Sequence, residues 1–283
     1  MKIGIICSRV RPEEKLLFNE IRKQGHELVK IDDRKLMFDL TKKPDFNADI
    51  IIIRSISHSR FLYISKILNN RGIKTINSYD VGKVCGDKLL TSLILEKNNI
   101  KTPRVRVAFN QRSALKAIEE LRYPVVIKPN VGSWGRLMAK VENRNQAESI
   151  LEHKKTLGDY YHSIFYIQEY IDKPGRDIRA FVVGRKVIAA IYRKSEHWIT
   201  NTARGGSASN CPVTDEIKDI CLKSADAVGG GVLALDLFET KDNGLMVNEI
   251  NHTMEFRNSI KTTGVNIPGR IVEYLENTAN KKS

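Results

Sequence analysis

Cysteine is scarce in this chain, and none of it stands in a metal-binding spacing. The four cysteines, Cys7, Cys85, Cys211 and Cys221, are scattered over 283 residues without a CxxC pair. That distribution argues against both a zinc site and a disulfide framework. We therefore expect buried free thiols.

Long apolar runs are also absent. No stretch reaches the roughly 18 apolar residues that a spanning helix needs, so we expect no membrane partner. Residues 1–7 are too short for a signal peptide and lack a small-residue cleavage site. They predict a first buried strand instead, in a cytoplasmic protein.

Acidic residues are outnumbered, 33 against 47 Lys and Arg, which gives a net charge of +14. The electrostatic field of this net positive charge would attract an anionic partner and speed its association. The basic residues are spread along the chain and do not alternate with aromatic residues as in RNA-binding segments. Charge therefore indicates an anionic partner, which could be a nucleotide, a nucleic acid or an acidic protein. We expect no nucleic-acid partner, although a nucleic-acid-binding module remains the non-enzymatic alternative.

The hydrophobic pattern predicts three units. Residues 1–84 alternate strand and helix signals, which predicts an open parallel sheet; the all-isoleucine run at 50–53 is typical of a strand covered on both faces. Residues 85–165 predict a smaller lobe, including a serine-capped helix over 113–121. Residues 166–283 predict a strand-rich lobe. The fold class is thus α/β (α+β), with lobes around a cleft.

Two apolar runs of strand length carry polar residues in their middle. These are residues 232–238 (VLALDLF) and 245–251 (LMVNEIN). An acidic residue within such a run is unusual and indicates a specific role, because burying an unpaired charge costs free energy. If residues 241–244 close a hairpin, Asp236 lies beside the polar residues of the second run.

The second run predicts a cation site. Alternation along a strand puts Glu249 and Asn251 on one face and Asn248 on the other. Together with Asp236, two carboxylates and an amide oxygen form a hard-oxygen set suited to Mg²⁺ that also carries nucleotide phosphates. The alternative is an ordinary hairpin whose acids face water or pair with lysines.

A lysine and a glycine-bearing loop form a second candidate. Lys128 ends a predicted buried strand, just before residues 130–136 (NVGSWGR). An ammonium and exposed backbone N–H groups could hold phosphate oxygens there. The loop matches neither GxGxxG nor GxxxxGK[ST], so a solvated lysine beside a flexible hairpin is the alternative.

Further polar residues follow two later strands. QEYI at 168–171 and GRDIR at 175–179 provide backbone edges for an adenine, and Glu169 or Asp177 could take ribose hydroxyls. The alternative for both acids is surface capping. Arg193, before the glycine-rich residues 201–206, could stabilise charge on a transferred phosphoryl group, or could face water.

The joint pattern is more specific than its parts. Lys88 in a helix, Lys128 before a glycine loop, and then QEYI, GRDIR, LDLF and NEIN in this order resemble the ATP-grasp superfamily, in particular its RimK-like ligases. With GSWGR, NTARGG and NEINHTMEF, the chain is similar to the LysX family, α-aminoadipate–LysW ligases of lysine biosynthesis. The glutamate-using ArgX ligases are near relatives.

This resemblance implies the roles of individual residues. Residues 1–84 would be a pre-ATP-grasp domain, and the two lobes would enclose ATP. Lys88 and Lys128 would contact ATP phosphates, Lys128 and Arg193 would be catalytic, and Asp236, Glu249 and Asn251 would bind Mg²⁺. The covering loop would comprise Gly132, Ser133, Trp134, Gly135, Arg136, Leu137 and Met138. The remaining ATP-binding residues would be Gln168, Glu169, Tyr170, Ile171, Asp177, Arg179, Arg193 and Asn201.

The resemblance also implies the reaction. ATP would phosphorylate the γ-carboxylate of the C-terminal glutamate of the acidic carrier protein LysW, and the α-amine of 2-aminoadipate would displace the phosphate. The pair Asn258-Ser259 is typical of LysX, whereas ArgX carries Gly-Phe. We therefore expect aminoadipate; glutamate ligation or glutamylation of another protein remains the alternative. We also expect a homo-oligomer, a dimer or a tetramer.

Overall fold

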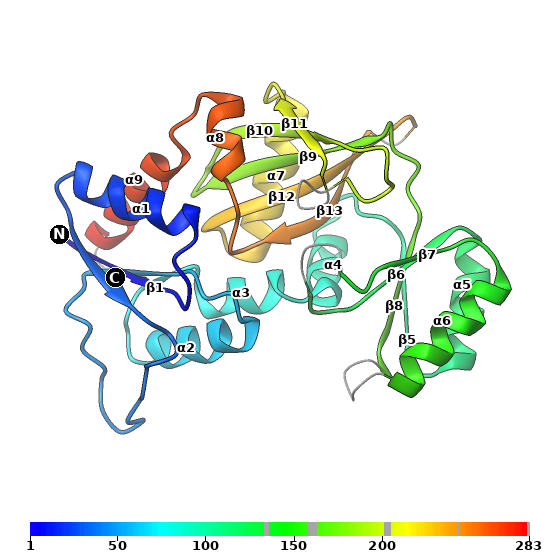
Figure 1. Ribbon diagram of the computed structural model, residues 1–283, viewed down its shortest axis with the longest axis horizontal. Helices are drawn as coiled ribbons and strands as arrows, with labels where there is room; N and C mark the ends of the chain where they lie inside the picture. Colours follow the sequence, from blue (N-terminus) through cyan, green and yellow to red (C-terminus); the bar gives the residue numbers. More distant parts are fainter. Residues whose placement is uncertain (133–135, 158–162, 201–204, 243, 282–283) are drawn as a thin grey trace.

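The computed structural model describes residues 1–132, 136–157, 163–200, 205–242 and 244–281. Three sheets follow one another along the chain. Figure 1 shows the N-terminal unit at one end, the central lobe in green at the other, and the C-terminal lobe between them. The α/β fold class is confirmed. Within the described residues, no helix has both the length and the apolarity to cross a membrane.

The N-terminal unit is a parallel sheet of order β2-β1-β3-β4. Helices α1 and α9 pack on one face of it, and α2 packs on the other. Pro12 at the start of α1 and Ser57 at the N-cap of α2 suit helix beginnings. The elements are β1 (Lys2–Ile6), α1 (Pro12–Lys23), β2 (Glu27–Ile31), β3 (Ile50–Ile53), α2 (His58–Asn70), β4 (Thr75–Ile76) and α3 (Tyr79–Cys85).

The central lobe is an antiparallel sheet of order β5-β8-β6-β7, with α5 and α6 packed on its apolar face. We expected the central lobe to end at residue 165. Strand β8 begins at that residue and pairs with β5 and β6, so it belongs to the sheet of the central lobe. The serine cap is wrong: Asn110 caps α5 by accepting a hydrogen bond from the Ser113 backbone N–H. The elements are α4 (Lys88–Lys97), β5 (Val105–Ala108), α5 (Gln111–Leu121), β6 (Val125–Lys128), β7 (Ala139–Val141), α6 (Arg144–Leu157) and β8 (Phe165–Glu169).

The C-terminal lobe is an antiparallel sheet of order β11-β10-β9-β12-β13. Helix α7 covers one face, and the other face shares a core with α1 and α9 of the N-terminal unit. The elements are β9 (Arg176–Val183), β10 (Lys186–Lys194), β11 (Ser207–Asn210), α7 (Asp215–Val228), β12 (Val232–Thr240), β13 (Gly244–Asn251), α8 (Arg257–Thr263) and α9 (Ile267–Asn280). The expected hairpin exists as β12 and β13.

All four cysteines are buried and free, as expected. None of them forms part of a metal-binding cluster in the described part of the chain.

Candidate functional site

A cavity of about 340 Å³ opens where the three units meet. Its walls come from the N-terminus of α1 and the segment after β3, from β6 and β8, and from the inner face of β9, β10, β12 and β13. This size and this position between lobes are typical of small-molecule sites.

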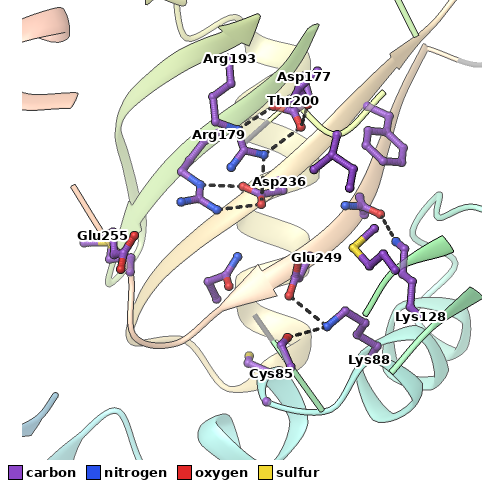
Figure 2. A pocket seen from close by; sticks show the side chains of 18 of the residues that line it. Cys85, Lys88, Lys128, Asp177, Arg179, Arg193, Thr200, Asp236, Glu249 and Glu255 are labelled. Carbon is purple, nitrogen blue, oxygen red and sulfur yellow. Dashed lines mark hydrogen bonds and ion pairs between the residues drawn. The ribbon is translucent and has the colours of Figure 1, made fainter. Parts of the chain in front are cut away.

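Four charged side chains of the C-terminal sheet form a buried cluster in the cavity wall. Strand pairing places Arg179 beside Asp236 and Arg193 beside Asp177. Arg179 donates to both oxygens of Asp236 at 2.7 and 2.8 Å, and Arg193 donates to both oxygens of Asp177 at 2.6 and 2.9 Å. Arg193 Nη2 also lies 3.1 Å from Asp236 Oδ2, which joins the two pairs (Figure 2).

This cluster stabilises the charged forms of Asp236 and Arg193. Burial disfavours charge on Asp236, but Arg179 and Arg193 outweigh it and hold the pKa of Asp236 below its usual range. Burial likewise works against the charge of Arg193, yet Asp236 and Asp177 raise its pKa. Arg193 is 4% exposed, so the alternative in which it faces water is wrong.

Asp236 and Glu249 are direct neighbours across the hairpin, as predicted. The face predicted for Asn248 is wrong, however. A β-bulge interrupts the pairing after Asp236, because Leu237 pairs with Val247 rather than with Asn248. The extra residue breaks the alternation of faces. Asn248 and Glu249 therefore both line the cavity.

The expected Mg²⁺ ligands have suitable chemistry. Glu249 Oε1 contacts Lys88 Nζ at 3.4 Å, and about a quarter of its side chain (26%) stays exposed. Asn251 also lines the cavity, and its Nδ2 has no hydrogen-bond partner among the described residues. Asp236 completes a set of two carboxylates and an amide, all hard donors that fit Mg²⁺.

Both predicted phosphate lysines line the cavity. Lys88 donates to the Gly132 carbonyl at 2.8 Å, and Lys128 donates to Gln168 Oε1 and Asn248 Oδ1, each at 2.9 Å. Lys128 is buried, so the expected alternative of a solvated lysine is wrong. Burial lowers the pKa of Lys128 to about 7, and Glu249 partly opposes this.

The predicted adenosine residues separate into two groups. Gln168, Tyr170 and Ile171 line the cavity. Glu169 binds the backbone N–H and Nε of Arg104, each at 2.7 Å, and is not part of the lining. Asp177 lines the cavity but is already engaged by Arg193 and by Thr200, which donates to it at 2.5 Å.

The covering loop is described only at its ends, where Gly132 and Met138 line the cavity and Leu137 is exposed. Arg136 is exposed as well. Ser133, Trp134, Gly135 and Asn201 lie outside the described residues.

The predicted specificity pair does not line the cavity. Asn258 is exposed on α8, and Ser259 is buried on the same helix. Helix α8 packs on β10 and β11, behind the cavity wall.

Sequence reasoning missed several lining residues. Lys173 donates to Thr200 Oγ1 at 2.6 Å and lies 3.6 Å from Asp177 Oδ2. Its position two residues after the QEYI segment was the available signal. The lining residues of the N-terminal unit, among them Arg11, Ser55 and His58, gave no recognisable motif.

Comparisons with known proteins agree with this geometry. Residues 85–275 match the RimK-like ATP-grasp domain, and residues 3–84 match the LysX preATP-grasp domain. The chain is similar to the α-aminoadipate–LysW ligase LysX of Saccharolobus solfataricus, with 37% identity covering 93% of this chain and 96% of that protein. It is similar to the glutamate–LysW ligase ArgX of Sulfurisphaera tokodaii, with 34% identity covering 99% and 100%.

Solved structures of other proteins share the fold of this chain. A RimK domain ATP-grasp protein from Sphaerobacter thermophilus superposes with a TM-score of 0.83 at 24% identity, covering 97% of this chain and 99% of that chain. The D-alanine–D-alanine ligase of Bacillus anthracis complexed with ATP superposes with a TM-score of 0.74 at 20% identity, covering 99% and 97%.

Proposed function

Because this chain belongs to the RimK-like ATP-grasp family, we propose that it is an ATP-dependent ligase that joins 2-aminoadipate to the carrier protein LysW. The new amide would link the α-amine of aminoadipate to the γ-carboxyl of the C-terminal glutamate of LysW. The names of the related LysX proteins support both substrates. The observation that carries the proposal is the joined Arg179–Asp236–Arg193–Asp177 cluster, beside Glu249, in one cavity with two lysines.

A carboxylate becomes a useful electrophile only when one of its oxygens can leave. ATP supplies this by transferring its γ-phosphoryl group to the carrier carboxylate, and the amine then attacks the acyl phosphate and releases phosphate. Lys88 and Lys128 are placed to hold the phosphates, and their charges offset the negative charge of the transferring group. Bound ATP would itself favour the charged form of Lys128, whose pKa is about 7 in the ligand-free cavity.

Mg²⁺, held by Asp236, Glu249 and Asn251, would neutralise phosphate charge. The two arginines on Asp236 keep that carboxylate ionised, and because both of its oxygens accept from them, Mg²⁺ would share Asp236 with Arg179 and Arg193. Arg193 bridges Asp177 and Asp236 in the cavity wall, and we assign it to the end of the cavity where the phosphoryl group would be transferred.

Glutamate is the competing substrate. The ArgX protein of Sulfurisphaera tokodaii is almost as similar in sequence, at 34% identity, as the LysX protein of the same organism, at 35%. The pair Asn258-Ser259 favours aminoadipate through the resemblance described above.

One assay tests the proposal. The protein is mixed with ATP, Mg²⁺, LysW and either aminoadipate or glutamate, and the carrier is weighed by mass spectrometry. We expect LysW to gain one aminoadipate, with loss of water and with release of ADP and phosphate. No mass gain with either amino acid, in the presence of intact carrier, would contradict the proposal.

A further inference from the structure

Thr200 lies at one end of the chain of ion pairs that contains Arg193. It is 1% exposed, and its hydroxyl lies between an ammonium and a carboxylate. The hydroxyl donates to Asp177 Oδ2 at 2.5 Å and accepts from Lys173 Nζ at 2.6 Å. Because a hydroxyl has a single proton to donate, these two bonds fix its direction. Figure 2 shows Thr200 beside Asp177.

The segment after β10 bends so that Thr200 returns to Asp177. The backbone N–H of His197 donates to Ser195 Oγ at 3.1 Å. The backbone N–H of Ile199 donates to His197 Nδ1 at 3.0 Å. Two side chains thus satisfy the backbone of this non-helical segment, and such local bonds favour a bend over continued strand structure.

The Thr200 hydroxyl separates a lysine from the carboxylate that holds Arg193. Lys173 Nζ lies 3.6 Å from Asp177 Oδ2, whereas a direct charge-assisted bond is about 2.7–2.9 Å long. Arg193 Nη2 donates to the same oxygen at 2.9 Å and lies 3.1 Å from Asp236 Oδ2. A lysine in direct contact with Asp177 Oδ2 would therefore compete with the arginine for that oxygen.

Burial makes this competition strong. The side chains of Lys173, Asp177 and Arg193 are 8%, 6% and 5% exposed. Charges attract one another more strongly where water is excluded. Burial lowers the pKa of Lys173, and the nearby Asp177 opposes this shift. The ammonium would therefore be stabilised by a direct approach to Asp177.

We propose that Thr200 is a positioning residue for Arg193. Its hydroxyl satisfies both Lys173 and Asp177, and so leaves Asp177 to hold Nε and Nη2 of the guanidinium. Arg193 in turn keeps Nη2 beside Asp236, one of the carboxylates assigned to Mg²⁺. This assignment rests on the proposed function, in which Arg193 stabilises the transferred phosphoryl group.

A double-mutant cycle tests this role through the single-turnover rate of LysW conjugation at saturating ATP and aminoadipate. Thr200→Val replaces the hydroxyl with a methyl group of similar size, and we expect the rate to fall roughly 10-fold or more. Lys173→Met removes the competing ammonium, so adding Thr200→Val to that variant should slow it less than about threefold. Thr200→Ser keeps the hydroxyl and should retain most of the parent rate.

Thr75→Val is the matched control for loss of a buried threonine hydroxyl. Thr75 is 5% exposed, and its hydroxyl bonds to uncharged groups, the Asn77 carbonyl and the Asn69 amide. We expect the folded control to conjugate LysW within about twofold of the parent rate, since no charged group loses a partner.

The cycle separates positioning from a general structural role. If Thr200 only supports the fold, Thr200→Val slows conjugation equally with and without Lys173, and this result would overturn the proposal. A Thr200→Ser variant as slow as Thr200→Val would overturn it too, as would a Thr200→Val variant with the parent rate.

Thermal unfolding of each variant identifies loss of fold. If Thr200→Val does not fold, Lys173→Met is compared with the Lys173→Met, Thr200→Val double variant, and a difference of 10-fold or more between them would contradict the proposal. Failure of the proposed function is separate, because it appears as absence of conjugate with the parent protein.

Discussion

At the scale of residues, the site depends on carboxylates that are paired with arginines. Asp236 and Asp177 are both buried, and Arg179 and Arg193 hold the pKa of Asp236 below its usual range. Glu249 differs, because within the described ranges its ion-pair partner is Lys88 alone, at 3.4 Å. It is therefore the carboxylate most available to a cation.

Replacing Glu249 with Ala should abolish Mg²⁺-dependent turnover. We expect a loss on the order of 100-fold or more in ATP consumption, since a metal ligand and its negative charge are both removed. Thermal unfolding should change little, because the Glu249 side chain is partly exposed. Glu142→Ala, at an exposed glutamate of the central lobe, is the control. Normal turnover of the Glu249 variant would remove the basis of the metal site.

Lys128 should make the stability of the ligand-free protein depend on pH. Its pKa is lowered by burial from 10.5 to about 7. Between these values the unfolded chain holds a proton that the folded chain lacks, so the free energy of unfolding rises with pH, by at most about 1.4 kcal/mol per pH unit. Lys128→Met should reduce this slope. Denaturant unfolding of both proteins near pH 7 and pH 9 measures it; parallel pH profiles would contradict the prediction.

At the scale of elements, the bulge in β13 and the position of α8 matter most. The bulge brings Asn248 to Lys128, which connects the C-terminal sheet to the central lobe. Helix α8 lies against β10, the strand that carries Arg193. A change in α8 can therefore reach the cavity through that strand, although Asn258 and Ser259 do not line it.

We predict that Asn258→Gly combined with Ser259→Phe lowers activity with aminoadipate and raises activity with glutamate. One methylene distinguishes the two substrates, so a change in their ratio of roughly 10-fold is the expected scale. Ser259 is buried, and phenylalanine there should overpack the contact and lower stability by about 1–3 kcal/mol. Competition assays with both amino acids give the ratio. An unchanged ratio in the folded double variant would contradict the role of this pair.

At the scale of the molecule, a net charge of +14 favours an acidic partner. The cavity itself mixes lysines and arginines with paired carboxylates, so the excess charge lies largely elsewhere on the chain. This fits docking of a large acidic carrier more than binding of a small amino acid. The expected homo-oligomer stays a prediction.

Raising ionic strength should therefore weaken the binding of the carrier much more than the binding of the amino acid. We expect KM for LysW to rise several-fold between low and physiological salt, with little change in KM for aminoadipate, since exposed charges are screened beyond about 8–10 Å. A neutral osmolyte at equal osmolality controls for general solvent effects. Equal salt sensitivity of both constants would count against charge-steered docking.

The sequence alone determined the β12–β13 hairpin, the parallel N-terminal sheet and two of the lysines that line the cavity, because periodicity, buried acids and motif order are local properties. Tertiary structure decided the rest. The bulge that turns Asn248 toward Lys128 depends on strand pairing, and the partners of Asp236 come from neighbouring strands of the same sheet. The N-terminal wall of the cavity depends on Arg54, directly after β3, which donates to the Met254 carbonyl 200 residues away. The periodicity of a single segment does not predict such contacts, because they arise when one unit packs on another.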